Sequence, residues 1–383
     1  MSSAANGTMS PPPRALVLGG VALALVVLMA AVAELADRPV LLPGGQLGDT
    51  TVEDLAGPNA FPKAVVDPAG RRVVLDRPPT AIASVILGGD EMLARLVAPS
   101  RVRSITYLAD DPGISNVSGV YPASVLRNHG GIEEVIAAEP DLAIVAAYTN
   151  AVTAGLLLDT GIAFLRFVHF DTHDDIRRNV RTLARAVGSS ARGEAWLDEM
   201  DRRIAAVQTK VADRARPRVL YYSLSGSTAG PGSLMDETIT FAGGDNVIAG
   251  TGLGALPRIS PETVISLQPE VILLSGWSGG VGPAAHEVLL EDPAWRDVPA
   301  VRDGRVYSLS GAWITSVSPH RVGGVEEVAK LLHPRAFEAE QATSAARVAT
   351  ADGAAFSFRR EAEAPVRGVA EIGALDAVAG AGL

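Results

Sequence analysis

The segment Glu133–Val145, which reads EEVIAAEPDLAIV, recurs in nearly the same form as Glu262–Leu274, which reads ETVISLQPEVILL. In each copy a short helical segment ends at a proline, an acidic residue follows, and a continuous apolar run completes the copy. Such a run is typical of a parallel strand that is covered on both faces. Two equivalent helix–strand units therefore predict two similar α/β lobes. The identities are few, so two ordinary αβ units without a common origin are an open alternative on this pattern alone.

Strands and helices alternate along most of the chain, which predicts parallel sheets. In the first half we expect a β-hairpin (64–67 and 71–75), strands at 81–86, 102–106, 142–146 and 163–168, and helices at 90–97, 133–138, 151–158 and 174–187. In the second half we expect strands at 218–223, 271–274 and 305–309, helices at 234–242 and 319–332, and a helix that starts at Ser260-Pro261-Glu262 with the serine as its N-cap.

A long helix is predicted between these halves, at Ala191–Arg214. Its apolar residues recur at helical spacing and form one stripe, namely Trp196, Met200, Ile204, Val207 and Val211. At about 1.5 Å per residue the helix spans roughly 36 Å, which is the width of a small domain. We expect it to join the lobes as a stiff strut that Pro217 ends.

The N-terminal region contains one apolar run of membrane type, Ala15–Ala33, between Arg14 and Glu34. It is just long enough to span a bilayer, and Ala31-Val32-Ala33 also fits a signal-peptide cleavage site. A membrane anchor and a cleaved signal both stay open, and either one predicts export of the rest of the chain. The predicted domains are a signal or anchor (1–36), a tether (37–62), a first lobe (63–190), the connecting helix (191–216), a second lobe (217–334) and a disordered tail (335–383).

Composition excludes several classes of function. The net charge is −10 and no block of like charge occurs, which argues against nucleic acid or an anionic membrane surface as the main partner. The chain has no cysteine, which excludes disulfides, thiolate metal sites, cysteine catalysis and a lipoprotein anchor.

Three short motifs compete for other functions. Gly88–Met92 reads GGDEM and is similar to the GGDEF signature of diguanylate cyclases, but the sequence continues as an amphipathic helix and not as a hairpin. His169, Asp171 and His173 could share one face of a strand end and hold a metal; the alternative is a strand end followed by a capped helix. Ser225–Gly232 lacks the Gly-Lys-Ser/Thr ending of a phosphate loop, which argues against nucleotide binding.

A family resemblance rests on a series of segments in a fixed order: VVDPAGRRVVLDRPP, GGDEMLARLVAPSRVRSIT, IEEVIAAEPDLAIVAA, FAGGDNVI, ISPETVISLQPEVILLSG, AWRDVPAVRDGRVYSL and SPHRVGGVEEVAKLLHP. Through them, Lys63 to Pro334 resembles a class III periplasmic substrate-binding protein, from the iron-siderophore, haem and cobalamin family that serves ABC importers. The resemblance implies an α/β fold of two Rossmann-like lobes with parallel sheets, one long connecting α-helix, and a ligand cleft between the lobes. It also implies that the repeat is a true duplication.

The resemblance gives the repeated glutamates a role. In that family one glutamate at this point of each lobe docks with arginines of the membrane permease, which here corresponds to Glu133 and Glu262. Carboxylates in a first helical turn are favoured by the helix dipole, and charge pairs steer encounter. Glu134 could replace Glu133 in the first lobe.

The implied cleft would be walled by the loops that follow the strands. Their aromatic, histidine and arginine residues are the ligand-binding candidates: Tyr107, Tyr121, Arg127, His129 and Tyr148 in the first lobe, and Tyr222, Arg258, Trp277, Trp313, His320 and Arg321 in the second. Arg127 and Arg258 precede the repeated helices at similar places, and arginines facing each other suit an anionic or catecholate-like ligand. The family usually has Ser-Pro-Arg near the end, whereas Ser318–Arg321 reads SPHR, so His320 is an alternative contact.

These patterns favour a monomeric, non-enzymatic protein without a cofactor, which captures a metal chelate at the periplasmic or extracytoplasmic face and delivers it to an ABC permease dimer in the inner membrane. A ferric siderophore is expected first, haem with an axial tyrosine or histidine second, and cobalamin third. The alternatives are an enzyme or cofactor-holding module on the same two-lobed fold, or an envelope sensor that uses 335–383 to bind a partner.

Overall fold

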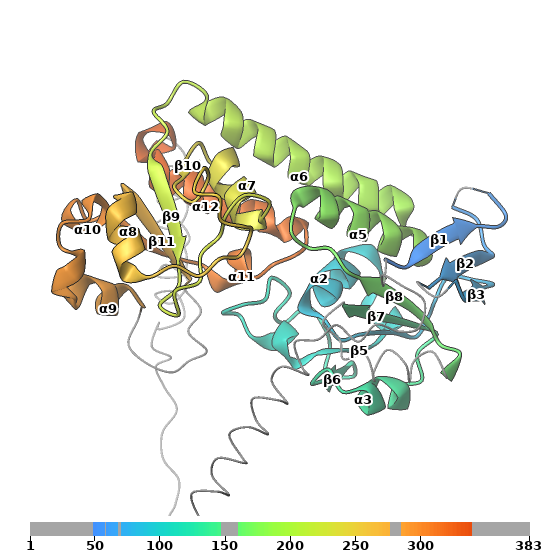
Figure 1. Cartoon of the computed structure of the whole chain (residues 1–383). Coiled ribbons are helices and arrows are strands. Elements are labelled where there is room, and N and C mark those ends of the chain that lie inside the picture. Colours follow the sequence, from blue (N-terminus) through green and yellow to red (C-terminus); the bar gives the residue numbers. More distant parts are fainter. Residues whose placement is uncertain (1–48, 58, 68–69, 147–159, 276–284, 339–383) are drawn as a thin grey trace, which may run out of the picture.

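The computed structural model describes residues 49–57, 59–67, 70–146, 160–275 and 285–338. They form two α/β lobes with one parallel sheet each, and a small antiparallel sheet at the outer side of the first lobe (Figure 1). The two-lobed α/β fold with parallel sheets is therefore confirmed.

The first lobe is built on a five-stranded parallel sheet in the order β6-β5-β4-β7-β8. Its strands are β4 (Ile82–Ser84), β5 (Val102–Thr106), β6 (Leu126–Asn128), β7 (Leu142–Ala146) and β8 (Ala163–Phe167). Its helices are α2 (Leu87–Leu96), α3 (Ile132–Ala137) and α5 (His173–Ala186), with the 3-10 turns η1 (Pro99–Arg101) and η2 (Tyr107–Asp110). The helix expected at 151–158 lies outside the described residues.

The small sheet consists of β1 (Thr51–Asp54), β2 (Lys63–Val66) and β3 (Arg72–Leu75). The β2–β3 hairpin was predicted, but β1 lies inside the segment that was predicted to be a tether, so that prediction is wrong from residue 49 onward. The chain already contacts the first lobe there: Thr50 Oγ1 accepts a hydrogen bond from Arg166 N of β8 at 2.8 Å, and Asp49 accepts one from Val168 N at 2.8 Å.

The second lobe is built on a four-stranded parallel sheet in the order β10-β9-β11-β12. Its strands are β9 (Arg218–Tyr222), β10 (Asp245–Asn246), β11 (Val271–Ser275) and β12 (Val306–Leu309). Its helices are α7 (Leu234–Phe241), α8 (Pro261–Leu267), α9 (Ala285–Glu291), α10 (Pro299–Arg302), α11 (Gly311–Ile314) and α12 (Val322–Leu332), with the 3-10 turns η3 (Pro293–Trp295), η4 (Pro319–Arg321) and η5 (Pro334–Ala336).

The two sheets repeat one topology, because β5-β4-β7-β8 and β10-β9-β11-β12 have the same order and direction. The sequence repeat corresponds to α3–β7 and α8–β11. Glu139 and Gln268 occupy the same place in the two copies, and each has a backbone φ of 47°, an unusual left-handed conformation for a residue with a side chain. The repeat predicted from the sequence is thus present in the fold of both lobes.

The acidic residue of each copy connects it to the first strand of its sheet. Asp141 accepts hydrogen bonds from the backbone N–H groups of Thr80 and Ala81, at 2.7 and 3.0 Å. Glu270 does the same for Arg218 N, at 2.8 Å. These carboxylates satisfy donors at the amino-terminal edge of each sheet, which explains why an acid follows the proline in both copies.

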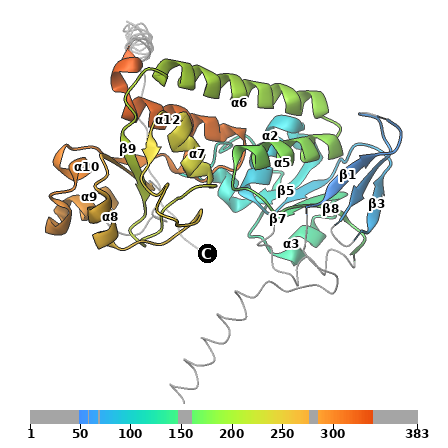
Figure 2. The ribbon, with the colours of Figure 1, turned by 45° about the horizontal axis from the view of Figure 1, so that its top comes forward.

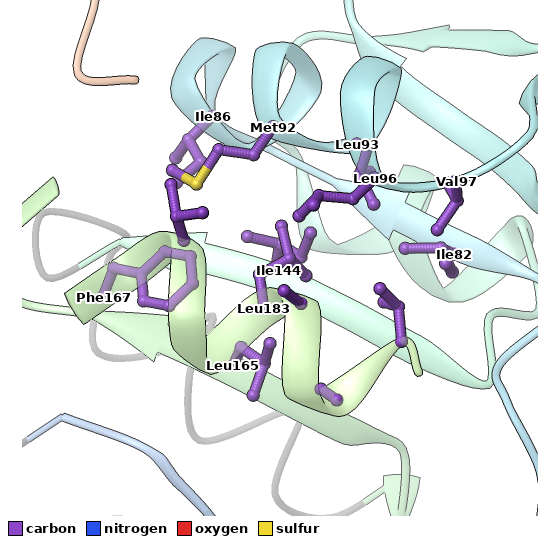
Figure 3. Close-up of a cluster of buried hydrophobic side chains, with 14 of the residues drawn as sticks. Ile82, Ile86, Met92, Leu93, Leu96, Val97, Ile144, Leu165, Phe167 and Leu183 are labelled. Carbon is purple, nitrogen blue, oxygen red and sulfur yellow. The ribbon is translucent and has the colours of Figure 1, made fainter. Parts of the chain in front are cut away.

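The apolar run of each copy is buried on both faces of its sheet. In β7, Leu142 and Ile144 face the core shared with α2 and α5, whereas Ala143 and Val145 face the side of α3. Figure 3 shows Ile144 between Leu93 of α2 and Leu183 of α5. Because a strand alternates its side chains between its faces, a run without polar residues requires cover on both sides.

Helix α6 (Ser190–Val211) lies along both lobes, as Figure 2 shows. Trp196 and Ile204 belong to the core of the first lobe, and Val207 and Val211 to that of the second. The predicted strut is confirmed, with the apolar stripe divided between the two cores. Beyond the second lobe, Phe337 is 2% exposed and packs in its core, so the folded part extends past the predicted boundary at Pro334.

Candidate ligand-binding site between the lobes

The lobes contact each other at a buried carboxylate. Glu91 of α2 is fully buried and its Oε2 accepts hydrogen bonds from Ser316 Oγ at 2.6 Å and Ser318 Oγ at 2.7 Å. Asn116 Nδ2 donates both to Glu91 Oε1 and to the Ala312 carbonyl, each at 2.7 Å. We call these five residues the Glu91 contact.

The Glu91 contact defines how the sheets are oriented. Helix α2 follows the carboxyl end of β4, and the segment that holds Ser316 and Ser318 follows the carboxyl end of β12. The two sheets therefore direct their carboxyl edges toward each other, which is the edge at which open α/β sheets bind ligands. We therefore expect a ligand between the lobes to contact the loops that follow the other strands.

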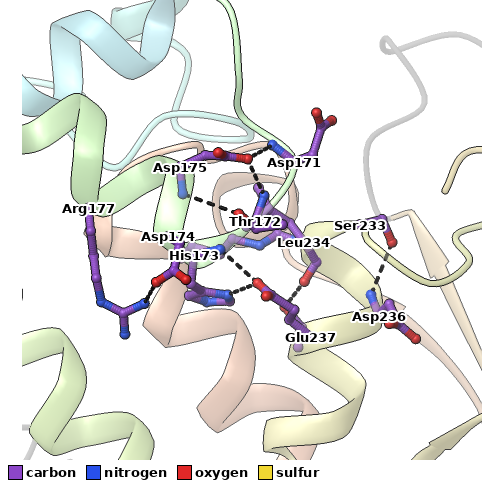
Figure 4. A network of polar contacts seen from close by, with 12 residues as sticks. Asp171, Thr172, His173, Asp174, Asp175, Arg177, Ser233, Leu234, Asp236 and Glu237 are labelled. Carbon is purple, nitrogen blue, oxygen red and sulfur yellow. Dashed lines mark hydrogen bonds and ion pairs between the residues drawn. The ribbon is translucent and has the colours of Figure 1, made fainter.

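A second contact joins α5 to α7 (Figure 4). His173 is buried, and both its backbone N and its ring Nδ1 lie 2.7 Å from Glu237 Oε2. Thr172 and Asp175 form a capping box at the start of α5. The capped-helix alternative for this motif is therefore confirmed, and the described residues contain no group of three histidine, aspartate or glutamate side chains placed to hold a metal.

The GGDE segment also has a structural role. Gly88, Gly89, Asp90 and Glu91 all lie inside α2. A Cβ on Gly88 would collide with the side chain of Val317 from the other lobe. The glycine thus allows the helix to approach the second lobe closely, and the hairpin that the cyclase alternative needs is not formed.

On the first lobe, two predicted residues form an exposed pair at the sheet edge. Tyr107 follows β5 and is 50% exposed, and His129 follows β6 with 71% of its side chain exposed. Their rings stack with centroids 4.9 Å apart and planes at 24°. Glu134 holds the histidine through its backbone N at 2.7 Å. The pair presents two groups that can ligate a metal centre.

On the second lobe, Arg258 is exposed and donates from Nη2 to the Ser225 carbonyl at 2.5 Å, in the loop that follows β9. Trp313 is half-buried and its ring lies against α12, where a Cβ on Gly323 would be 2.6 Å from a ring atom. Both residues keep part of their surface exposed, and their contact with a ligand stays a prediction. Tyr148 and Trp277 lie outside the described residues.

Three residues predicted to contact a ligand are buried in the structure, and their contacts lie within the protein. Tyr121 is 5% exposed and donates its hydroxyl to the Asp90 carbonyl at 2.5 Å. Tyr222 is 3% exposed and packs on Trp295. Arg321 is 3% exposed and donates to the Ile314 carbonyl at 2.7 Å. Burial lowers the pKa of Arg321 to about 10, so the guanidinium stays charged at neutral pH. It also donates to the carbonyl of Ser316, which belongs to the Glu91 contact.

Two further predicted contacts are occupied by the protein itself. Arg127 forms a two-point ion pair with Asp110 at 2.7 and 3.0 Å and donates to the Val125 carbonyl, so it braces the loop after β5. His320 packs edge-on against Trp196 with ring centroids 5.2 Å apart, and burial lowers its pKa. Arg127 is therefore already paired with a carboxylate, which weakens the argument for two arginines that face one anionic ligand.

The two glutamates that were predicted to dock with a permease occupy equivalent exposed positions. Glu133 and Glu262 both lie in the first turn of a short helix, α3 and α8. A hydrogen bond from the Ser260 hydroxyl lowers the pKa of Glu262. Because Glu134 is used to hold His129, Glu133 is the better candidate for the first lobe, which the sequence had left open.

The fold and the way its lobes meet define a two-lobed binding protein. The family described as periplasmic binding protein matches residues 82–312, and the chain belongs to this family. It is 26% identical to a cobalamin-binding protein of Halobacterium salinarum over 72% of this chain and 75% of that one. It is 23% identical to an ABC transporter substrate-binding lipoprotein of Bacillus subtilis over 73% of this chain and 88% of that one.

A solved structure confirms the architecture. The haem-binding protein RhuT of Roseiflexus, in its apo form, superposes with a TM-score of 0.56 at 24% identity, over 67% of this chain and 98% of that one. No helix among the described residues is long and apolar enough to cross a membrane, and the run at Ala15–Ala33 lies outside them. Family membership implies an extracytoplasmic location.

Proposed function

We propose that this protein captures a cobalamin or a closely related metal tetrapyrrole outside the cytoplasmic membrane and delivers it to an ABC importer. The observation that carries the proposal is where apolar side chains are exposed. Of the nine large apolar side chains exposed in the described part of the chain, five lie on loops that follow strands of the two parallel sheets: Tyr107, Val120, Leu224, Leu253 and Leu256. Exposed apolar groups gathered at a binding edge indicate a ligand with broad apolar faces.

The relatives support the same ligand class, since the Halobacterium protein is described as cobalamin-binding. The expectation of a ferric siderophore relied on Arg127 and Arg258 facing one anionic ligand. Arg127 is paired with Asp110, so this argument no longer favours a small, highly charged chelate. A macrocycle needs fewer charged contacts and gains more from apolar burial, at about 25 cal/mol per Å².

Haem is the second candidate, because the Tyr107–His129 pair offers a phenol oxygen and an imidazole nitrogen at the exposed edge. Either group can serve as an axial ligand of haem iron. Replacement of His129 by alanine should then change the absorption spectrum of the haem complex. With cobalamin as the ligand, the same substitution should alter affinity modestly.

The test is an absorption spectrum and native mass spectrometry of freshly purified protein, followed by calorimetric titration with cyanocobalamin, haemin and a ferric catecholate. We expect one-to-one saturable binding of cyanocobalamin without chemical change of the ligand. Tight binding of the catecholate alone would contradict the proposal, and turnover of any of the three compounds would favour an enzyme.

A further inference from the structure

A row of hydroxyl groups follows the carboxyl end of β9. Ser223 and Ser225 lie in a tight turn that the hydrogen bond from Gly226 N to the Ser223 carbonyl closes at 2.7 Å, and Ser227 follows on the returning arm of the hairpin. Ser223 Oγ lies 3.0 Å from Ser225 Oγ, which lies 3.1 Å from Ser227 Oγ. Arg258 is attached to the same hairpin through a bridge to Ser227 and a hydrogen bond to the Ser225 carbonyl. We call these four residues the polar rim.

The hydrogen-bond count of the rim leaves capacity for a ligand. Three hydroxyl groups carry three hydrogens, and the two Oγ–Oγ contacts use two of them. The remaining O–H is at Ser223, Ser225 or Ser227, depending on which hydroxyl donates in each of the two contacts. The row can therefore present either a donor or an acceptor at each end. A primary amide, which carries both functions, matches this property.

Arg258 adds a fixed positive charge beside the row. Its side chain is exposed, and a guanidinium has five N–H donors in a planar fork. The hydrogen bond to Ser225 uses one of them and orients the group. The other donors can bind a carbonyl or, more strongly, a carboxylate. Arg258 is also within the lobe segment that contains exposed Leu253 and Leu256.

Exposed leucines and the polar rim therefore occur on the same two loops of the second lobe, with Leu224 in the hairpin after β9 and Leu253 and Leu256 in the segment before Arg258. Leu224 lies between Ser223 and Ser225 in the turn and is exposed. A ligand that matches these loops has an apolar body and a periphery of hydrogen-bonding side chains.

We propose that the polar rim is the specificity-determining subsite of the second lobe, and that it binds the amide and carboxylate side chains at the edge of a corrinoid. The proposal depends on the ligand class proposed above. It identifies the residues that bind the groups at the periphery of the ligand. It makes Ser223, Ser225 and Ser227 binding residues that their residue type alone did not indicate.

A ligand series on the unaltered protein provides the first test. Cyanocobalamin is compared by calorimetry with its monocarboxylate derivatives, in which one peripheral amide is hydrolysed. We expect at least one derivative to bind about threefold or more tightly than cyanocobalamin, because a carboxylate makes a charge-assisted contact with Arg258. If every derivative binds equally or more weakly, Arg258 does not read the periphery and the proposal is wrong.

Two variants provide the second test. In Arg258→Gln the preference for the carboxylate derivative should disappear. In the triple variant Ser223→Ala, Ser225→Ala, Ser227→Ala, affinity for cyanocobalamin should fall roughly tenfold, as expected for one or two lost hydrogen bonds. Thr209→Ala is the matched control, since this exposed hydroxyl bonds only within α6 in the described structure, to the Ala205 carbonyl.

The outcomes separate the two proposals. Unchanged binding by both variants, with normal binding by the unaltered protein, overturns the polar rim and leaves the corrinoid function standing. Absence of cyanocobalamin binding by the unaltered protein overturns both. If circular dichroism shows that a variant is unfolded, its binding result is set aside. The ligand series on the unaltered protein then decides, because it needs no substitution.

Discussion

At the scale of single residues, Asp90 is the side chain whose burial has the clearest energetic consequence. It is fully buried in α2, and Thr106 donates to its Oδ2 from both the backbone N and the hydroxyl, at 3.1 and 2.6 Å. Its Oδ1 has no hydrogen-bond partner among the described residues. Burial, aided by the neighbouring charge of Glu91, raises the pKa of Asp90 well above 3.8.

Asp90→Asn should therefore stabilise the protein at neutral and alkaline pH. A carboxyl with a raised pKa binds its proton more tightly in the folded state, so its contribution to stability is lost as the pH rises from 3.8 through the folded value. Asparagine keeps an acceptor for Thr106 and cannot ionise. We expect a gain in the free energy of unfolding on the order of 1–3 kcal/mol at pH 8 that shrinks toward pH 4. Urea unfolding at several pH values measures it.

The control for this substitution is Asp198→Asn, on the exposed side of α6. It should change the free energy of unfolding by less than about 0.5 kcal/mol at every pH. A gain for Asp90→Asn that does not vary with pH would mean that repacking, and not the ionisation of the carboxyl, causes it.

At the scale of elements, the sequence predicted the structure best where a strand is covered on both faces. The bounds of β7 agree with the prediction to the residue, because its apolar run has sharp ends. The bounds of β5 agree as well, although Arg103 and Ser104 interrupt its apolar residues. β6 was missed, since it is a three-residue edge strand that includes Arg127 and Asn128. β1 was missed because its four residues pair only with a hairpin strand and carry Glu53 and Asp54.

The candidate site was predictable only in part, for a related reason. Tyr107 directly follows the predicted strand β5, and loops at strand ends can be located from the strand pattern. His129 follows the missed strand β6 and Arg258 lies twelve residues after β10, so only their place before the repeated helices indicated them. Glu91 was missed because its partners Ser316 and Ser318 lie 225 and 227 residues away, and no local pattern links them. The buried Tyr121, Tyr222 and Arg321 have the residue types of ligand contacts, but tertiary packing decides which side of a loop is exposed.

The Glu91 contact should fix the position of one lobe against the other. Glu91→Ala leaves the two serine hydroxyls and the Asn116 amide without their acceptor, and Glu91→Gln places an N–H group against donors. We expect Glu91→Gln to lower the free energy of unfolding by about 1–3 kcal/mol and Glu91→Ala to lower it further. Denaturant unfolding measures both, with Glu194→Gln, an exposed partner of Arg181, as the near-neutral control.

The same contact makes a prediction about lobe motion. The chain has no cysteine, so spin labels can be attached at cysteines introduced at the exposed Asp111 and Asp303, one in each lobe. The distribution of distances between the two labels should be wider in Glu91→Ala than in the protein with the native Glu91. In the control Glu194→Gln it should stay unchanged. An unchanged distribution would show that α6 and the His173–Glu237 contact suffice to hold the lobes.

At the scale of the whole molecule, Glu133 and Glu262 are related by the same duplication as the sheets. Both lie in the first turn of the helix that precedes a central strand, so each is positioned by its lobe and not by a flexible loop. A partner that binds both carboxylates at once senses the spacing of the lobes. The rigid connection through α6 and the Glu91 contact means that this spacing is largely set before the partner arrives.

Glu133→Arg combined with Glu262→Arg should therefore abolish uptake of cyanocobalamin in cells that contain the cognate importer, while calorimetric affinity for the ligand stays unchanged. Each charge reversal places an arginine where the partner is expected to present arginines. Electrostatic attraction between the two proteins is then replaced by repulsion. Asp198→Arg with Asp213→Arg is the control, because these exposed acids at α6 give the same change in net charge on another surface. If the control and the double glutamate variant lose uptake equally, net charge and not docking geometry is responsible; if the glutamate variant transports normally, the importer recognises a different surface.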